Sequence, residues 1–385
     1  MKALAAAAVI VSGLTGFAQA YIHGDLPNDT HAWAVHDKNR PNPVKVTAEV
    51  GKPPSDAIVL FDGTQKSVDK NWHNWGKPTG WVATNGTFLC VPGKGGACTK
   101  QSFGDCQLHI EWMAPHGLRG KGQSRGNSGV FLMDKYEIQV LDSYETDPAF
   151  PEKNPNYPDG QAGAVYGQTI PLVNPARPAG EWQSYDIIFH QPVWKDGKVL
   201  YPGSMTVFFN GVLVQDHWEL EGPTLYMRRT ANAKHAEKAP LSLQDHGNPV
   251  PYRNIWIREI PSRYANTTHG GPAVNKDDVL ALRGKTASRL AAKIKPDTKL
   301  ADRLRAWAEV LSYASRPEYL EGYNKAARQY VEMIAKFDKQ AFMSKRRELD
   351  AVRSDCIKLI AAKVLPEDAP VAEAVLALYK KYPVK

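Results

Sequence analysis

The sequence predicts a mainly β protein, an antiparallel jelly-roll sandwich followed by a C-terminal α-helical bundle, and three observations support this. Between residues 57 and 262, short alternating or apolar runs are separated by Gly, Pro, Asn and Asp turns. Nine of the ten tryptophans precede residue 270, where a large β core would need them. From residue 276 onward, the apolar period becomes that of helices.

Residues 1–20 have the pattern of a secretory signal, with an early lysine, an apolar stretch and a small-residue cleavage site. We therefore expect a mature chain that starts at Tyr21 and is periplasmic or secreted. Residues 21–56 are rich in Pro, Asn and His and are expected to form an extended arm over the β domain. No later segment has the roughly 20 apolar residues of a transmembrane helix.

The jelly-roll domain is expected at residues 57–262. Its strands are predicted at residues 57–61, 88–91, 107–112, 129–133, 136–141, 184–189, 205–209, 241–243 and 255–260. Asn210-Gly211 is a typical two-residue hairpin turn. Two long loops, residues 144–161 and 226–240, contain too many prolines or polar residues for strands. Loops of this length are usually functional, so we expect them to form the walls of a cleft over one sheet.

After a linker at residues 263–275, the basic helical bundle is expected at residues 276–385. Its helices are predicted at residues 277–294, 299–315, 317–338, 339–364 and 370–382, with prolines between them. Residues 271–385 hold 23 Lys+Arg and 15 Asp+Glu, which accounts for the whole net charge of +8, because residues 1–270 hold 25 of each. The basic residues are interleaved with acids, which favours a solvated surface over a nucleic-acid partner.

Four cysteines in an oxidising compartment suggest disulfides. Cys90 and Cys98 flank a glycine-rich turn and are predicted to form a local disulfide. Cys106 and Cys356 are expected as buried free thiols, with a long-range bridge as the alternative. None of the four has metal-type spacing.

A polar pattern interrupts the hairpin NSGVFLMDKYEIQVLD at residues 127–142. Because side chains alternate along a strand, Glu137, Gln139 and Leu141 share one face, and Ile138 and Val140 face the core on the other. A carboxylate and an amide side by side, rimmed by the turn at Asn127, are suited to a polyhydroxylated ligand.

A second polar group lies at Asp245-His246 and at Arg253, late in the domain. Asp245 could orient His246 for acid–base work, because a carboxylate raises the imidazole pKa and fixes its tautomer. The alternative is a polar turn whose hydrogen bonds are all satisfied.

Four further residues are candidates for ligand contacts. His109 and Glu111 share one strand face and could join Glu137 on the concave sheet, or could simply face solvent. Tyr166 and Trp182 offer rings on which a sugar could stack, or could belong to the core.

A retaining glycosidase would need two carboxyl groups roughly 5–5.5 Å apart. On a single strand this would give three acidic positions on one face, whereas here that face carries Glu137, Gln139 and Leu141. The strand is therefore not suited to ordinary double-displacement hydrolysis.

Several segments together resemble the 3-keto-disaccharide hydrolase family, which has a concanavalin-like jelly roll. They are FGDCQLHIEW (103–112), NSGVFLMDKYEIQVLDS (127–143), GAVYG (163–167), GEWQSYDI (180–187), FFNGVLVQD (208–216) and LQDHGNPVPYRNIWIRE (243–259). The resemblance covers residues 57–262 and leaves the arm and the bundle outside it. Cys106 stands where the family usually has an aromatic residue.

The resemblance implies cleavage of 3-keto-glycosides by removal of the C2 proton, β-elimination and hydration. This route needs one base, one acid and a group that stabilises the enolate. By position, Glu137 and His246 would be the base and the acid in either order, with Asp245 orienting His246. Asn127, Gln139 and Arg253 would hold the sugar or the enolate oxygen.

A divalent metal could polarise the ketone, although no spacing demands one. The absence of a glycine-rich dinucleotide fingerprint means that a separate sugar 3-dehydrogenase would have to supply the substrate. Two other readings remain, a non-catalytic carbohydrate-binding module and a conventional glycan hydrolase.

Overall fold

The computed structural model describes residues 22, 24–118, 120–144, 154–262 and 276–383. The chain divides into two compact units, one of residues 44–269 and one of residues 1–43 together with 270–385. The predicted signal at residues 1–20 and the predicted linker at residues 263–275 lie outside the described residues. Every helix in the described part of the chain is too short or too polar to cross a membrane.

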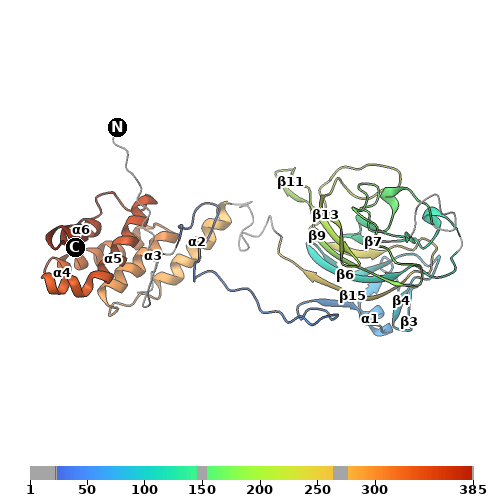
Figure 1. The fold of residues 1–385 in the computed structure, drawn as a ribbon, viewed down its shortest axis with the longest axis horizontal. Coiled ribbons are helices and arrows are strands. Elements are labelled where there is room, and N and C mark those ends of the chain that lie inside the picture. The colour runs from blue at the N-terminus through green and yellow to red at the C-terminus, as the bar shows by residue number, and fades with distance from the viewer. Residues whose placement is uncertain (1–21, 23, 119, 145–153, 263–275, 384–385) are drawn as a thin grey trace. The chain divides into compact units, whose positions relative to one another are not determined.

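The β unit consists mainly of two antiparallel sheets (Figure 1), as predicted. The larger sheet has the order β13-β12-β9-β6-β15-β4-β3, with β1 also paired to β15. Its strands are β1 (Ile58–Phe61), β3 (Val82–Thr84), β4 (Thr87–Leu89), β6 (Cys106–Met113), β9 (Trp182–His190), β12 (Ser204–Phe209), β13 (Val212–Glu219) and β15 (Pro251–Glu259).

The smaller sheet has the order β2-β5-β14-β7-β8. Its strands are β2 (Trp72–His73), β5 (Ala97–Phe103), β7 (Ser128–Leu132), β8 (Tyr136–Val140) and β14 (Ala239–Leu243). A separate hairpin joins β10 (Val193–Lys195) to β11 (Lys198–Tyr201). Short 3-10 helices lie at Gly122–Ser124 and Pro158–Gly160.

Residues from both sheets share one core. On β6, Leu108 and Ile110 are fully buried while His109 and Glu111 are only partly covered, which is the alternation that the sequence shows. On β8 the inward residues are Tyr136, Ile138 and Val140. Each such side chain contributes about 1.5–3 kcal/mol of hydrophobic stabilisation.

Several elements of this unit were not expected from the sequence, among them a helix and the strand β5. The helix α1 (Gln65–Asn71) begins at Thr64, whose hydroxyl accepts a hydrogen bond from the Ser67 amide at 3.2 Å. The strand β5 carries exposed polar residues in its middle, which hides its alternation.

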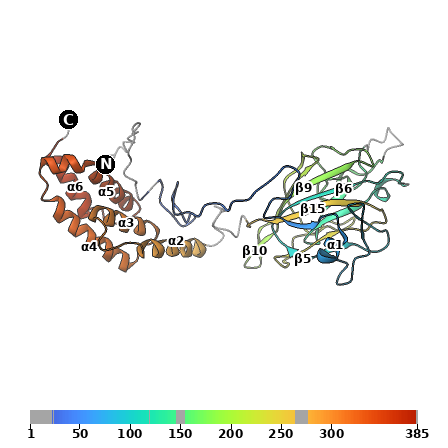
Figure 2. The same cartoon turned by 90° about the horizontal axis from the view of Figure 1, so that it is seen from below.

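The second unit contains the five expected helices (Figures 1 and 2). They are α2 (Lys276–Ala291), α3 (Leu300–Tyr313), α4 (Pro317–Ile334), α5 (Lys339–Ala361) and α6 (Pro370–Lys381). Pro317 and Pro370 occupy first-turn positions, where proline lacks only an amide that would be unpaired in any case.

The N-terminal segment packs on these helices, which differs from the expected arm over the β domain. Ile22 is buried in the helical core. The Asn39 amide donates hydrogen bonds to Glu309 Oε1 at 2.8 Å and to the Tyr313 hydroxyl at 3.2 Å. The described residues before Val44 thus belong to the helical unit, because the helices bury Ile22 and provide hydrogen-bond partners for Asn39.

Candidate functional site

A cavity of about 260 Å³ lies over the outward face of the smaller sheet, at β7 and β8. Strands, the segment after β14 and three loops contribute its lining. The lining residues are Gln123, Asn127, Phe131, Glu137, Gln139, Tyr166, Thr224, Leu225, Tyr226, Gln244 and His246. Five of the residues singled out from the sequence therefore meet in one cavity.

The β8 strand places Glu137 and Gln139 in this cavity while Tyr136, Ile138 and Val140 point into the core. The predicted faces are confirmed for Glu137, Gln139, Ile138 and Val140, whereas Leu141 follows the end of the strand, is fully buried and does not line the cavity. The β7 strand pairs Gly129 with Gln139 and Phe131 with Glu137. A Cβ atom on Gly129 would lie 2.4 Å from Glu137 Oε1, so only glycine leaves room for this carboxyl group.

Glu137 is the most unusual ionisable group of the cavity. The residue is 4% exposed, and burial raises its pKa from 4.5 to about 8. Among the described residues, no side chain donates a hydrogen bond to its carboxyl group. Desolvation without compensation keeps a carboxylic acid neutral near pH 7, and such a group can exchange a proton with a ligand.

Three amides surround the space beside Glu137. Asn127 donates from its Nδ2 to Gln123 Oε1 at 2.8 Å, and Gln139 donates from its Nε2 to Gln123 Oε1 and to Asn127 Oδ1, both at 3.1 Å. Gln123 in turn donates from its Nε2 to the carbonyl of Gly160 at 2.8 Å. The amide cluster is thus held in one orientation, as recognition of sugar hydroxyls requires.

Tyr166 stands at the edge of the cavity because its segment extends the sheet. Gln139 N donates to the Ala164 carbonyl at 3.0 Å, and Tyr166 N donates to the Glu137 carbonyl at 3.2 Å. The Tyr166 hydroxyl lies 2.8 Å from the Tyr157 hydroxyl. Tyr166 is therefore fixed by backbone pairing at one end and by a loop residue at the other.

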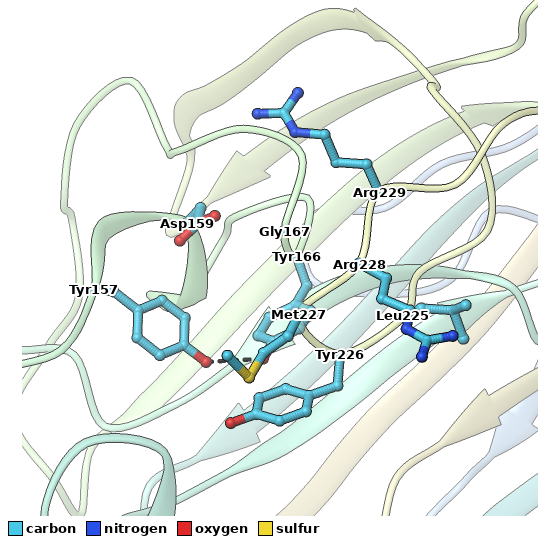
Figure 3. A pocket seen from close by; sticks show the side chains of 9 residues that line it. All are labelled: Tyr157, Asp159, Tyr166, Gly167, Leu225, Tyr226, Met227, Arg228 and Arg229. Carbon is cyan, nitrogen blue, oxygen red and sulfur yellow. Dashed lines mark hydrogen bonds between the residues drawn. The ribbon is translucent and has the colours of Figure 1, made fainter.

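A second cavity of about 390 Å³ adjoins the first and shares Tyr166, Leu225 and Tyr226 with it (Figure 3). Tyr157 and Asp159 reach it from one of the two long loops, and the run Leu225–Arg229 comes from around the start of the other. The prediction that both loops wall a cleft is confirmed for their described parts. Residues 145–153 lie outside the described residues.

His246 lines the first cavity, but Asp245 does not orient it. The Asp245 carboxylate accepts hydrogen bonds from Gly95 N at 3.0 Å and from Gly247 N at 2.9 Å. It therefore fixes the turn that presents His246, and the predicted Asp–His pair is wrong. His246 lines the first cavity and Asp245 does not.

Four residues predicted near Glu137 lie instead on the outward face of the larger sheet. They are His109 and Glu111 on β6, Arg253 on β15 and Trp182 on β9. The prediction that they contact the ligand in the cavity is not supported, because β6 pairs with β9 and β15 and not with β8.

These four residues form a network with Asp186 and Asn254. His109 Nδ1 lies 2.7 Å from Asp186 Oδ1, Asn254 Nδ2 donates to Glu111 Oε1 at 2.9 Å, and Arg253 Nε donates to Glu111 Oε2 at 2.6 Å. The Arg253 guanidinium lies 4.0 Å from the centre of a Trp182 ring. Burial raises the pKa of Glu111, but the hydrogen bonds from Asn254 and Arg253 lower it overall.

The predicted disulfide is absent: Cys90 and Cys98 are buried free thiols, as are Cys106 and Cys356. Cys90 follows β4 of the larger sheet, whereas Cys98 lies on β5 of the smaller one and donates from its Sγ to the His73 carbonyl at 3.4 Å. The turn between them carries the chain from one sheet to the other. Burial and the nearby Asp245 raise the pKa of the Cys90 thiol to about 12.

Within the described residues, no group of three or more His, Cys, Asp or Glu side chains could hold a metal ion. Glu137 and His246 are the metal-binding residue types that line the first cavity. A metal there would need water or ligand oxygens to complete its coordination.

Sequence reasoning missed Gln123, Thr224 and Tyr226. Thr224 Oγ1 accepts a hydrogen bond from Glu137 N at 3.1 Å and so ties its loop to β8. Gln123 lies in a short 3-10 helix and Thr224 in a loop, and the polar residues of both segments resemble those of any solvated surface segment. Tyr226 is the first residue of the second long loop, and the prediction that this loop walls a cleft was the only sequence feature that pointed to it.

The comparisons with known proteins agree on the β unit. The family model of the 3-keto-alpha-glucoside-1,2-lyase-like domain matches residues 56–258. A crystal structure from Parabacteroides distasonis, provisionally described as a glycosyl hydrolase, is 42% identical; the match covers 57% of this chain and 93% of that one, with a TM-score of 0.52.

Two further structures are more distant. A second Parabacteroides distasonis protein with the same provisional description is 19% identical over 54% of this chain and 94% of that one, with a TM-score of 0.38. The carbohydrate-binding module CBM66 from Bacillus subtilis is 10% identical over 49% of this chain and 95% of that one, with a TM-score of 0.28. Among curated proteins, none matches this chain.

Proposed function

The chain belongs to the family of 3-keto-alpha-glucoside-1,2-lyase-like domains, and we propose that it cleaves 3-keto-glycosides by C2 proton removal, β-elimination and hydration. The family and the 42% identical relative support an enzyme that acts on glycans. The proposal adds the oxidised substrate and the order of the chemical steps.

One observation carries the proposal. Glu137 is the only carboxylic acid among the described lining residues of the first cavity, and it is buried with a pKa of about 8. A conventional glycosidase uses two carboxyl groups that flank the bond to be cleaved. A single proton-carrying acid beside ring-binding amides suits elimination, in which the C3 ketone activates the sugar.

The steps balance without a redox partner. The ketone acidifies the C2 hydrogen; a base removes it, the C1–O bond breaks, and an acid gives the leaving oxygen its proton. The product is an unsaturated ketone with a C1=C2 double bond. Water then adds its oxygen to C1 and a proton to C2, so a 3-keto-glycoside and water become a 3-keto sugar and an alcohol.

Glu137 is assigned as the acid, because a carboxyl group with a pKa of about 8 carries its proton at neutral pH. His246, across the same cavity, is assigned as the base that removes the C2 proton. Gln123, Asn127 and Gln139 hold the ring hydroxyls and the enolate oxygen.

The test incubates the protein with a 3-keto-disaccharide and with its unoxidised parent, in H₂O and in D₂O. We expect cleavage of the keto sugar alone, and deuterium at C2 of the product in D₂O beyond that found without protein. Cleavage of the parent with its C2 hydrogen retained would identify a conventional hydrolase. Binding of either sugar without cleavage would identify a carbohydrate-binding module.

The same assay with a chelator tests for a metal. Unchanged turnover would assign the chemistry to Glu137, His246 and the amides alone. Loss of turnover that an added divalent cation restores would add a metal at the ketone.

Two parts of the proposal concern the setting of the reaction. The N-terminal pattern supports a periplasmic or secreted enzyme. A sugar oxidised at C3 must come from a separate dehydrogenase, since the substrate is already a ketone when it reaches this chain.

A further inference from the structure

The second cavity differs in chemistry from the first. Three tyrosine rings, Tyr157, Tyr166 and Tyr226, gather around it together with Leu225 and Met227 (Figure 3). The Tyr157 and Tyr166 hydroxyls bond to each other, so part of their hydrogen-bonding capacity is already used. This cavity presents flat apolar surface where the first presents amides.

A turn holds the apolar residues of this cavity at the surface. Leu225 pairs with Arg228 in an isolated β-bridge, with Tyr226 and Met227 at the tip. Leu225, Tyr226 and Met227 are 52%, 72% and 83% exposed. Three neighbouring apolar side chains exposed to this extent beside a reactive cavity mark a ligand-binding surface.

The charges of this cavity are unequal. Arg228 and Arg229 oppose a single carboxylate, Asp159. Arg229 Nη1 lies 3.7 Å from Glu221 Oε2, whereas Arg228 has no acidic partner within ion-pair distance among the described residues. Figure 3 shows the Arg229 side chain extending away from the three rings. Arg228 is therefore the cation that is available to a ligand.

The position of Glu137 determines which part of a glycoside would occupy this cavity. Tyr166, which belongs to both cavities, donates its backbone N–H to the Glu137 carbonyl at 3.2 Å. Glu137 thus lies beside Tyr166, a residue that the two cavities share. If Glu137 protonates the departing oxygen, the C1 substituent lies on the Tyr166 side of the sugar, toward the second cavity.

We propose that the second cavity is a leaving-group subsite that selects an aromatic aglycone with a negatively charged substituent. The ring stacks on Tyr226 and Met227, and the anionic substituent pairs with Arg228. This inference rests on the proposed function, because it presumes that the sugar ring occupies the first cavity.

The test uses three 3-keto-glucosides that differ only in the aglycone: methyl, 4-carbamoylphenyl and 4-carboxyphenyl. The two aryl compounds match in shape and differ in charge. We expect Met227→Ala, which changes a residue that lines the second cavity and not the first, to lower kcat/KM about fivefold for both aryl substrates and to leave the methyl glucoside within about twofold. We expect Arg228→Gln to lower kcat/KM about tenfold for the carboxylate alone.

Arg253→Gln is the matched control, since it removes the same charge from the other sheet, where the Arg253 guanidinium lies over a Trp182 ring. It should leave the ratios among the three substrates unchanged. Equal losses for all three substrates in Met227→Ala or Arg228→Gln would overturn the subsite while leaving the proposed function intact.

A binding measurement separates failure of the subsite from failure of the chemistry. Free 4-hydroxybenzoate should bind the wild-type protein more tightly than 4-hydroxybenzamide, and Arg228→Gln should remove that preference. The preference without cleavage of any glucoside would retain the subsite and reject the proposed function. No preference for the acid would overturn the subsite.

Discussion

The two sheets of the β unit each carry polar side chains on their outward face, and the two sets differ in how far they satisfy one another. On the larger sheet, Asp186, His109, Asn254, Glu111 and Arg253 form a continuous network of hydrogen bonds and ion pairs. On the smaller sheet, three amides bond to one another while Glu137 has no such partner among the described residues. Residue type alone therefore does not distinguish a functional site from a surface network. The distinguishing feature is whether each polar side chain has a hydrogen-bond or ion-pair partner within the protein.

The two glutamates illustrate this difference. Glu111 lies among donors that lower its pKa overall despite its burial, whereas burial alone raises the pKa of Glu137 to about 8. A network in which charges are paired stabilises the fold. A buried acid without a partner costs stability, and proteins keep such groups where a ligand uses them.

The largest expected effect is on turnover. Glu137→Gln should lower kcat about 10³-fold, within the range for loss of a general acid, because the amide cannot donate the proton to the leaving oxygen. Glu111→Gln should stay within about twofold, since Glu111 lies on the other sheet. Steady-state rates on a 3-keto-disaccharide make the comparison, and equal losses in both variants would contradict it.

The second-largest expected effect is on the pH dependence of the free energy of unfolding, which should differ between Glu137 and Glu111. The native state keeps the Glu137 proton up to about pH 8, whereas the unfolded chain releases it near 4.5. The unfolded state binds fewer protons in this window, so stability falls as pH rises through it. At about 1.4 kcal/mol per pKa unit the effect is on the order of 5 kcal/mol.

Glu137→Gln should remove this loss and make the protein more stable than the wild type at pH 9. Urea unfolding at pH 5, 7 and 9 measures it. For Glu111, whose pKa is lowered, stability should instead be lost as pH falls below the normal range of a glutamate. A Glu137→Gln variant with the wild-type pH profile would mean that the carboxyl group is hydrated.

A smaller effect is expected from the amide cluster. Gln123→Ala removes the acceptor that orients both Asn127 and Gln139, so kcat/KM should fall about tenfold, mainly through KM. Asn254→Gly is its counterpart in the surface network; glycine tolerates the φ of 46° at that position. Asn254→Gly should reduce stability and leave kcat/KM unchanged. A loss of kcat/KM in Asn254→Gly together with a loss of stability alone in Gln123→Ala would mean that the functional site lies on the larger sheet.

The smallest effect concerns His109. Burial lowers its pKa, but the carboxylates of Asp186 and Glu111 raise it overall. Its contribution should be fully present below pH 6.5 and be lost as pH rises through its folded-state pKa. His109→Gln should therefore cost about 1 kcal/mol at pH 6 and less at pH 9, by thermal or urea unfolding. A cost independent of pH would mean that the ring acts through packing on Trp256 alone.

Much of the site was predictable because its signal is local. Alternation on β8 identified Glu137 and Gln139 as outward and Ile138 and Val140 as core, and the motifs led to Asn127, Tyr166 and His246. The long loops were expected as walls. Gln123 and Thr224 could not be found in this way, because nothing in a polar loop indicates which residue folds back over a sheet.

The errors have a common physical cause. His109 and Glu111 were assigned to one shared strand face, as observed, but they, Arg253 and Trp182 were assigned to the wrong sheet. Asp245 was predicted to orient His246 because the two are neighbours in sequence, whereas its carboxylate accepts hydrogen bonds from the backbone amides of Gly95 and Gly247. Cys90 and Cys98 were predicted to form a disulfide because they are close in sequence. Cys90, however, follows a strand of the larger sheet, and Cys98 lies on a strand of the smaller one.

The sequence by itself determined the fold class, the change from β to helical structure and the face on which each β8 side chain lies. These depend on periods of two or 3.6 residues and on turn residues, which are local properties of the chain. Only the tertiary structure decided which polar residues meet, since strand pairing joins segments that are distant in sequence. It also decided which carboxyl group is left without a partner, because desolvation depends on everything that folds around it.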